Sequence, residues 1–322
     1  MPRIVYVKED ESPQRSQQNP QYCDEYEQEI LEHMIKSESL HQPNKDYMKL
    51  QDSISEKMRA ILIDWIIEVH FQFKLLPETL FITINIVDRY LSETKIKKEQ
   101  LQLIGVTALL IACKYEEVLT PEIRDLEFIT DNSFKKREIL DTEHSILSSL
   151  QFSLTVITPT ILLGRFADKI KKSYGDSQPN ETLLLWNTLI FLAKYIIELQ
   201  LAEYRMLQYT PSLLAAGSLY LSLKMMRALD KKKKQLLPDW PSEMNKLIGR
   251  TEKDVRECAK DLCVILQNAE HSSLQAARKK YMLQEYQRVS LINVPDSGPN
   301  PKKKEKSHQE NNNMIKGYRE AR

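Results

Sequence analysis

Apolar residues recur every three or four positions along most of the chain, which is the spacing of helices that bury one face or more. No convincing alternation with a period of two interrupts this pattern, so strands are not expected. Prolines at 77, 159 and 211 stand where helices begin, and Ser133 is a candidate N-cap. The predicted helices cover residues 22–35, 56–73, 77–92, 97–115, a short stretch after 121, 133–150, 159–174, 180–199, 211–228, 238–248 and 251–268.

The two halves of this pattern resemble each other weakly. Small residues with the same spacing occur in one helix of each half, and they allow close packing of neighbouring helices. They are Gly105, Ala108 and Ala112 in the first half and Ala215, Ser218 and Ser222 in the second. We therefore favour an internal duplication over chance and expect an all-α fold of two tandem five-helix repeats. The predicted parts are a disordered arm (1–20), an N-terminal helix and connector (21–55), a first repeat (56–155), a second repeat (156–270) and an extension with a disordered tail (271–322).

Composition excludes several classes of enzyme. The chain has 7 glycines among 322 residues, too widely spaced for a dinucleotide fingerprint or a Walker loop. No two histidines are four residues apart and the four cysteines form no CxxC pair, so we expect neither a metal nor another cofactor. The net charge of +1 argues against a nucleic-acid coat. No secretory signal or membrane span is expected, and the protein should be intracellular.

The most informative segment is MRAILIDWIIEVH, residues 58–70. Met58, Ile61, Leu62 and Trp65 share one face of a helix, and apolar residues also cover most of the opposite side. A helix of this kind is normally central, with both faces in the core. Arg59 needs an acidic partner if it is buried, and Asp88 on the next helix is the best candidate.

This segment resembles the cyclin-box signature of the mitotic cyclins of types A and B. The resemblance continues through KLLPETLF, VDRYL, LQLIGVTALLIACKYEE, PEIRDLEFITDNS and EHSILSSLQFSL, and more thinly through YTPSLLAAGSLYLSLK and KKYMLQEYQRVSL. It covers about residues 26–292 and leaves the choice between the two types open. It implies two cyclin boxes and a regulatory subunit, not itself an enzyme, that activates a cyclin-dependent protein kinase during the cell cycle, with G2/M the expected phase.

The resemblance also implies a kinase-binding face. Lys114 and Glu143 match the charged pair that holds the kinase in this family, although for an unrecognised chain they would be ordinary charges at helix ends. The apolar residues that match kinase contacts are Ile30, Ile111, Tyr115, Leu147, Phe152 and Leu154, for which core packing is the alternative.

A second implied site is a groove that docks Arg-x-Leu segments of substrates or inhibitors. Two carboxylates beside an apolar trough suit a peptide with an arginine followed by a leucine. The matching residues are Met58, Ile61, Leu62, Trp65, Glu68, Leu101, Gln102 and Asp131, and the alternative is a wholly buried Trp65 face.

Two other functions remain open on the residues alone. A cyclin-fold transcription factor would bind DNA and polymerase, but a zinc ribbon and a basic surface are expected there. A helical hydrolase with a His-Asp metal site would need histidines that meet in space. The basic run 231–234 is expected to be a solvated loop, and the run 301–306 is a candidate nuclear import signal. We expect the protein in nucleus and cytoplasm. Residues 1–55 hold no Arg-x-x-Leu destruction box, and Arg137-x-x-Leu140 falls inside a predicted helix.

Overall fold

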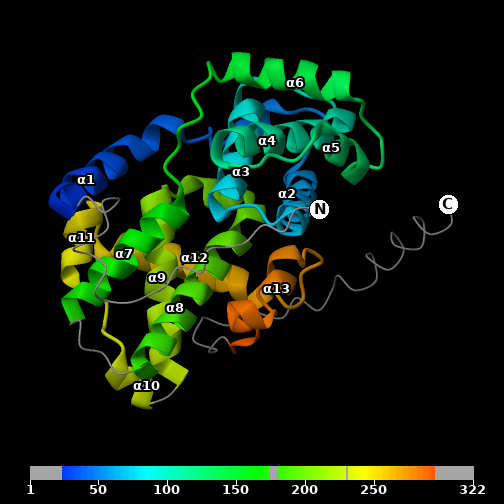
Figure 1. Ribbon diagram of the computed structural model, residues 1–322. Helices are drawn as coiled ribbons and strands as arrows, with labels where there is room; N and C mark the ends of the chain where they lie inside the picture. Colours follow the sequence, from blue (N-terminus) through cyan, green and yellow to red (C-terminus); the bar gives the residue numbers. More distant parts are fainter. Residues whose placement is uncertain (1–23, 175–179, 230, 294–322) are drawn as a thin grey trace.

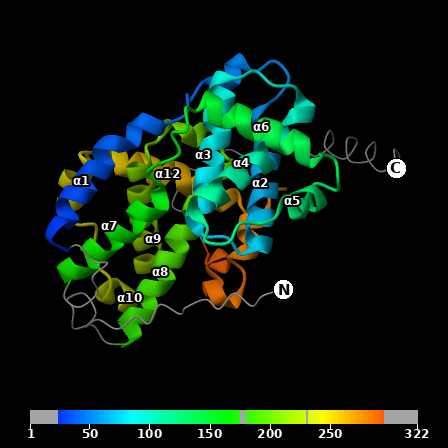
Figure 2. The same ribbon diagram turned by 45° about the horizontal axis from the view of Figure 1, so that its top comes forward.

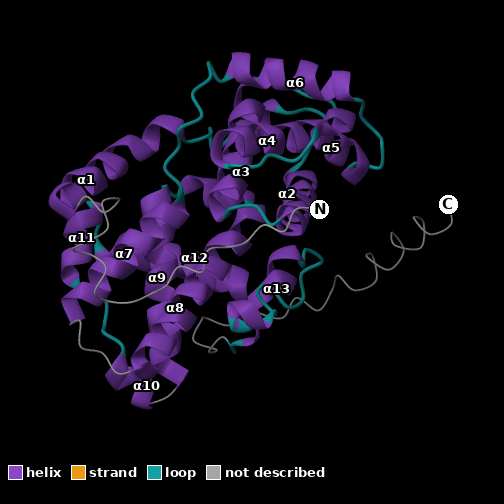
Figure 3. Cartoon of the chain, in the orientation of Figure 1, coloured by secondary structure: helices purple, strands orange, loops and turns teal. Residues whose placement is uncertain are grey.

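The computed structural model describes residues 24–174, 180–229 and 231–293, and the predicted arm and tail lie outside these ranges. The described residues form α-helices and short 3₁₀ helices without a strand (Figure 3). Two helical bundles sit side by side, with the N-terminal helix lying across the second and the C-terminal extension beneath the first (Figure 1). The prediction of an all-α fold is confirmed.

The first bundle is built around α4 (Leu101–Glu116), whose residues from Ile104 to Cys113 are all buried. Its other helices are α2 (Glu56–Phe73), α3 (Pro77–Glu93), α5 (Ile123–Ile129) and α6 (Lys136–Ser149). Gly105 permits the close approach of α4 to α2, because a Cβ there would lie 2.7 Å from Cδ1 of Leu62.

The second bundle repeats this plan around α9 (Pro211–Leu229), which packs against four neighbours. These are α7 (Pro159–Tyr174), α8 (Asn180–Leu199), α10 (Lys231–Leu236) and α12 (Glu252–Asn268), and α11 (Ser242–Ile248) completes the bundle. Gly217 allows α12 to approach α9, since a Cβ there would lie 2.9 Å from Sγ of Cys258. The small-residue stripes thus lie on the central helix of each bundle.

Two sequence predictions about the helices are wrong, and one short helix was not predicted. The basic run 231–234 belongs to α10 rather than to a loop. Helix α6 begins at Lys136, with Lys135 rather than Ser133 at the N-cap, because Glu138 accepts from the Lys135 amide at 2.9 Å. The extension also contains α13 (Ala276–Lys280), which hydrophobic spacing did not predict.

The N-terminal helix α1 (Glu27–Ser37) lies across the second bundle (Figure 2). Its fully buried residue is Leu31, with Met34 and Ile35 partly buried beside it. The buried carboxylate of Glu38 then accepts from the amide and hydroxyl of Ser212 at 2.7 Å each, which caps the start of α9. The N-terminal segment is therefore fixed to the second bundle by packing and by this cap.

Helix α8 and the residues that follow it form a longer apolar segment than the sequence analysis anticipated. Thr182–Ala202 is apolar and long enough by composition to cross a bilayer. In the fold its side chains at Trp186, Leu189 and Ile196 are buried between neighbouring helices. The segment is accounted for as a core helix of the second bundle.

Candidate functional site: a charged and apolar face on the first bundle

The last turn of α4 and the middle of α6 bring Lys114 and Glu143 into direct contact. The Lys114 Nζ lies 2.6 Å from Oε1 and 2.8 Å from Oε2 of Glu143. The side chain of Lys114 is 46% exposed, whereas that of Glu143 is 12% exposed. The pair therefore presents an accessible ammonium group beside a shielded carboxylate.

Exposed aromatic side chains flank this pair. Tyr115 is 45% exposed, and its hydroxyl lies 2.6 Å from Oγ1 of Thr155. Phe152 is 67% exposed and follows α6 in the left-handed region at φ 56°, directly after Gln151 at φ 51°. Two successive non-glycine residues in this region are uncommon, and here they turn the chain so that Phe152 stands out into solvent. An exposed phenyl group of this kind is a feature of protein-binding surfaces.

The other residues predicted to contact the kinase differ in how deeply they are buried. Leu147 and Leu154 are partly buried and pack against the core, leaving part of each side chain accessible. Ile111 is only 2% exposed, so the structure places it beneath the face, as support rather than as a surface contact. Ile30 lies partly exposed on α1 and therefore belongs to the N-terminal helix rather than to the bundle that carries Lys114.

Three exposed apolar residues near this face escaped the sequence analysis. Val118 and Leu119 follow α4 and are 97% and 66% exposed. Leu40 is 74% exposed and precedes His41, whose Nε2 lies 2.7 Å from Oγ of Ser153. Since Ser153 adjoins Phe152, the His41 bond brings Leu40 into the neighbourhood of the face. The sequence offered one indication of them: these three apolar residues do not fit the three-to-four-residue spacing of the neighbouring helices.

The residues predicted for the docking groove lie on α2, at the start of α4 and after α5. Ile61 is 53% exposed, and Met58 and Trp65 are partly buried beside it. Leu62 and Leu101 are 5% and 6% exposed, so they form the support of the groove rather than its surface. Its remaining members are Gln102, which is partly buried, and Glu68 and Asp131, which are both exposed.

Asp131 is held by the turn after α5. Its φ is 54°, and its amide donates to the carbonyl of Phe128 at 3.0 Å. Phe128 itself is 77% exposed on the same turn, and sequence analysis had not selected it. The residues predicted for the groove thus include partly exposed apolar side chains and two exposed carboxylates.

The buried ion pair between Arg59 and Asp88 is confirmed and holds more than two helices. Nε and Nη2 of Arg59 donate to the two Asp88 oxygens at 2.6 Å each, and Nη1 donates to the carbonyl of Leu201 at 3.0 Å. The Tyr47 hydroxyl donates to Asp88 at 2.7 Å. Burial opposes the charge of Arg59, but Asp88 outweighs it and raises the pKa of the guanidinium. The pair joins α2, α3 and the 3₁₀ segment after α8.

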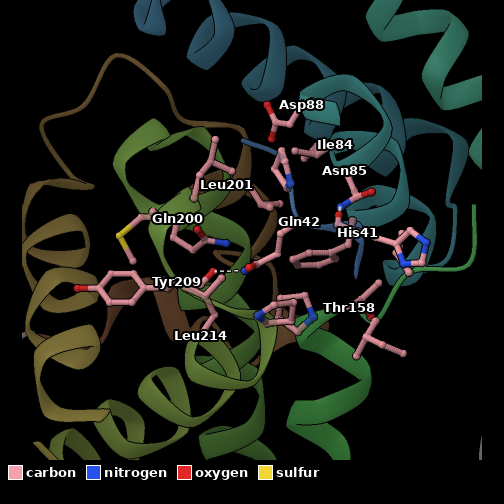
Figure 4. Close-up of a pocket in the computed structure, with 18 of the residues that line it drawn as sticks. His41, Gln42, Ile84, Asn85, Asp88, Thr158, Gln200, Leu201, Tyr209 and Leu214 are labelled. Atoms are coloured by element: carbon pink, nitrogen blue, oxygen red, sulfur yellow. Dashed lines mark hydrogen bonds between the residues drawn. The ribbon is translucent and has the colours of Figure 1, made fainter. Parts of the chain in front are cut away.

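A cavity of about 100 Å³ lies beside this pair, between the two bundles. Figure 4 shows it between the segment at His41 and Gln42 and the second bundle, with the Gln42 amide donating to the Tyr209 carbonyl at 3.3 Å. This volume suits a few water molecules rather than a cofactor. Among the described residues, no group of three or more His, Cys, Asp or Glu side chains is placed to hold a metal ion.

Two protein-family domains match successive parts of the chain. The model of the cyclin N-terminal domain matches residues 29–155, and that of the cyclin C-terminal domain matches residues 163–295.

Curated relatives include mitotic cyclins. The G2/mitotic-specific cyclin-B of Dictyostelium discoideum is 39% identical over 86% of this chain and 59% of its own length. The protein of that name from Marthasterias glacialis is 39% identical over 86% of this chain and 66% of its own length. Cyclin-A1-1 of Arabidopsis thaliana is 37% identical over 87% of this chain and 58% of its own length. The chain therefore spans about half to two thirds of the length of these relatives.

Solved structures share the fold at low sequence identity. A viral cyclin from herpesvirus saimiri matches with a TM-score of 0.58 and 20% identity, over 72% of this chain and 97% of its own. The yeast RNA polymerase II CTD kinase complex CTDK-1 contains a chain that matches with a TM-score of 0.51 and 15% identity, over 82% of this chain and 85% of its own.

Proposed function

The chain belongs to the cyclin family, and from this premise we propose that it is the regulatory subunit of a cyclin-dependent protein kinase. In this proposal it performs no chemistry of its own and acts by binding the kinase as a heterodimer. The observation that carries the proposal is the direct contact of Lys114 with Glu143, surrounded by exposed apolar side chains. A charged pair within an apolar rim is suited to hold a partner in one orientation.

The proposed mechanism is a shift in the population of kinase conformations. A kinase needs its Lys–Glu pair and its magnesium site assembled at the same time, and a subunit that binds only the assembled state favours it. Moving a 1:99 equilibrium to 99:1 requires about 5.5 kcal/mol of differential binding. An exposed ion pair contributes about 0–1 kcal/mol, so most of this energy must come from apolar contacts such as Phe152, Tyr115 and Leu40.

Rigidity of the binding face supports this mechanism. Lys114 and Glu143 stand on helices that pack against each other, and α4 is buried along most of its length. A face held in this way loses little conformational entropy on binding, so more of the contact energy remains for the partner. A flexible loop carrying the same residues would lose part of that energy on ordering.

Recruitment of Arg-x-Leu substrates or inhibitors is the second part of the proposal. Ile61 and Trp65 provide an apolar surface for the leucine, and Glu68 or Asp131 provides a carboxylate for the arginine. The groove lies on a different face from Lys114, so one molecule can bind kinase and substrate together.

The proposed setting is the G2/M stage of the cell cycle, in nucleus and cytoplasm. Its support is the similarity to relatives named G2/mitotic-specific cyclin-B. The basic run 301–306 is a candidate import signal that lies outside the described residues.

Affinity purification of the full chain from its own cells, with mass spectrometry of bound proteins, tests the proposal. We expect a protein kinase at about equal stoichiometry. Recovery of polymerase subunits without a kinase, together with a gel shift of DNA, would instead support a cyclin-fold transcription factor.

A further inference from the structure

A second and much larger cavity, of about 790 Å³, lies at the junction of both bundles and the C-terminal extension. The turn between α2 and α3 forms one side, α8 forms another, and the segment from α13 to residue 286 closes it. Small-molecule sites have volumes of about 300–1,000 Å³ and often lie between domains. This cavity is distinct from the two sites described above, because its lining includes neither Lys114 and Glu143 nor the residues predicted for the docking groove.

The walls of the cavity are largely apolar and aromatic. Phe191, Tyr281 and Tyr286 form a continuous aromatic surface, with ring centroids 5.9 Å apart for Phe191–Tyr286 and 4.9 Å apart for Tyr281–Tyr286. Leu76 and Leu283 are each 41% exposed and also line the cavity. Such walls favour a planar apolar ligand, because aromatic rings gain from offset or edge-to-face contact as well as from burial.

One charged group in the wall is already neutralised within the protein. The Lys280 Nζ lies 2.9 and 2.8 Å from the two oxygens of Glu198, and both side chains are less than 10% exposed. The Tyr281 hydroxyl donates to the same carboxylate at 3.1 Å. Glu198 is thus fully engaged and does not offer a site for a cationic ligand.

One cationic group in the wall remains for a ligand. Lys194 is partly buried on α8, and the described residues give it neither an ion pair nor a hydrogen bond. Glu285 also lines the cavity, but it is exposed, so solvent screens its charge. His70 is not available to a ligand, because its Nε2 donates to the Leu76 carbonyl at 2.8 Å and its Nδ1 is buried beneath the wall. A partly buried ammonium without a counter-charge favours an anionic group beside it.

We propose that this cavity binds a small aromatic acid. Its ring lies against Phe191 and Tyr286, and its acid group pairs with Lys194. A neutral ligand would leave the ammonium unpaired, and a cationic ligand would be repelled by it. The site goes beyond the proposed kinase regulation, because none of these residues belongs to the kinase-binding or docking face.

The probe for the test is 8-anilinonaphthalene-1-sulfonate, which combines aromatic rings, an N–H donor and an acid group. Its neutral counterpart, N-phenyl-1-naphthylamine, lacks only the acid. Fluorescence titration of the full chain should give one saturable site for the acidic probe. Lys194→Met should weaken it about tenfold, as expected for a charge-assisted hydrogen bond, while affinity for the neutral probe is kept.

Two further variants make the result decisive. Lys260→Met removes an exposed lysine on α12 and should leave both affinities unchanged. Leu283→Trp places a large ring at the cavity wall and should weaken both probes, whereas partial unfolding would raise their fluorescence without saturation. Equal affinity of Lys194→Met and Lys260→Met for the acidic probe would overturn the proposal. So would normal binding of both probes to Leu283→Trp.

Discussion

Arg59 on α2 and Asp88 on α3 form a buried bidentate ion pair with both bonds at 2.6 Å. The remaining Arg59 nitrogen reaches the Leu201 carbonyl, so the same side chain also ties the first bundle to the second. The geometry satisfies both partners, and loss of either one would leave an uncompensated charge in the core. This relationship sets the position of α2, which carries the proposed docking groove on its outer side.

Asp88→Asn should lower the free energy of unfolding by about 3–5 kcal/mol, because the guanidinium stays buried without a counter-charge. Urea unfolding followed by circular dichroism measures the change. The control is Asp141→Asn, which affects an exposed pair with Arg137 at 3.7 Å and should have no measurable effect. Similar curves for the two variants would mean that the buried pair does not stabilise the fold.

Ile61→Ala should weaken binding of an Arg-x-Leu peptide about tenfold, because the exposed part of Ile61 is buried by the peptide leucine. Fluorescence anisotropy with a labelled peptide measures this affinity. Val264→Ala removes an apolar side chain of similar exposure on α12 and should leave the affinity unchanged.

Trp65→Ala should reduce both docking and stability, since the indole also packs against the core. Phosphorylation of a short substrate without the Arg-x-Leu motif should survive in the kinase complex of either groove variant. If Ile61→Ala reduced phosphorylation of the substrates with and without the motif to the same extent, the groove would not be a peptide-docking site.

Stability should fall as the pH drops below 6.5. Burial, followed by the positive charge of Lys280, lowers the pKa of His70 from its ordinary value of 6.5. Well above pH 6.5 neither state binds the proton, whereas between pH 6.5 and the lower pKa of folded His70 the unfolded chain takes up more protons than the folded chain. The free energy of unfolding therefore falls as the pH drops through this range. His41 adds in the same direction, because burial and then Arg89 lower its pKa.

Urea unfolding at pH 7.5, 6.5 and 5.5 checks this pH dependence. His70→Gln should retain more of its stability between pH 6.5 and 5.5 than the unchanged chain. His271→Gln, at an exposed position, should follow the unchanged chain. A parallel loss in all three proteins would assign the pH dependence to other groups.

Local features of the sequence were sufficient to predict most of the helices and one tertiary contact, the ion pair of Arg59 with Asp88. Proline at the start of α3, α7 and α9 and the apolar spacing between them predicted these helices closely. The partner of Arg59 followed from the cost of burying an unpaired charge, which leaves few acidic candidates on a neighbouring apolar helix. Contact between Lys114 and Glu143 was implied by family resemblance rather than by spacing.

Features that depend on the assembled fold could not be predicted in this way. The spacing of Tyr26, Ile30, His33 and Met34 predicts that these residues share one side of the N-terminal helix. In the structure Leu31 is the buried residue of α1, with Met34 and Ile35 partly buried, because the second bundle lies on that side. The depth of Ile111 depends on the packing of α6 over α4. The larger cavity is formed by three segments distant in sequence, so no single stretch carries its signal.

Asp64, for which the sequence offered no role, illustrates the same limit. Its Oδ1 accepts from the Ala276 amide at 2.9 Å and so caps the start of α13. The bond spans more than two hundred residues and exists only because the extension returns to the inner side of α2. Hydrophobic spacing carries no information about such a return.

Reversal of the Lys114–Glu143 pair tests the central claim most directly. The double variant Lys114→Glu, Glu143→Lys keeps an ion pair within the chain, so its thermal unfolding should match that of the unchanged chain, while the charges offered to a partner exchange places. The measurement is phosphorylation of a histone-type substrate by the kinase that co-purifies with the chain, reconstituted with each protein. We expect activation by the unchanged chain and its loss with the folded double variant. Full activation by the double variant would contradict the account.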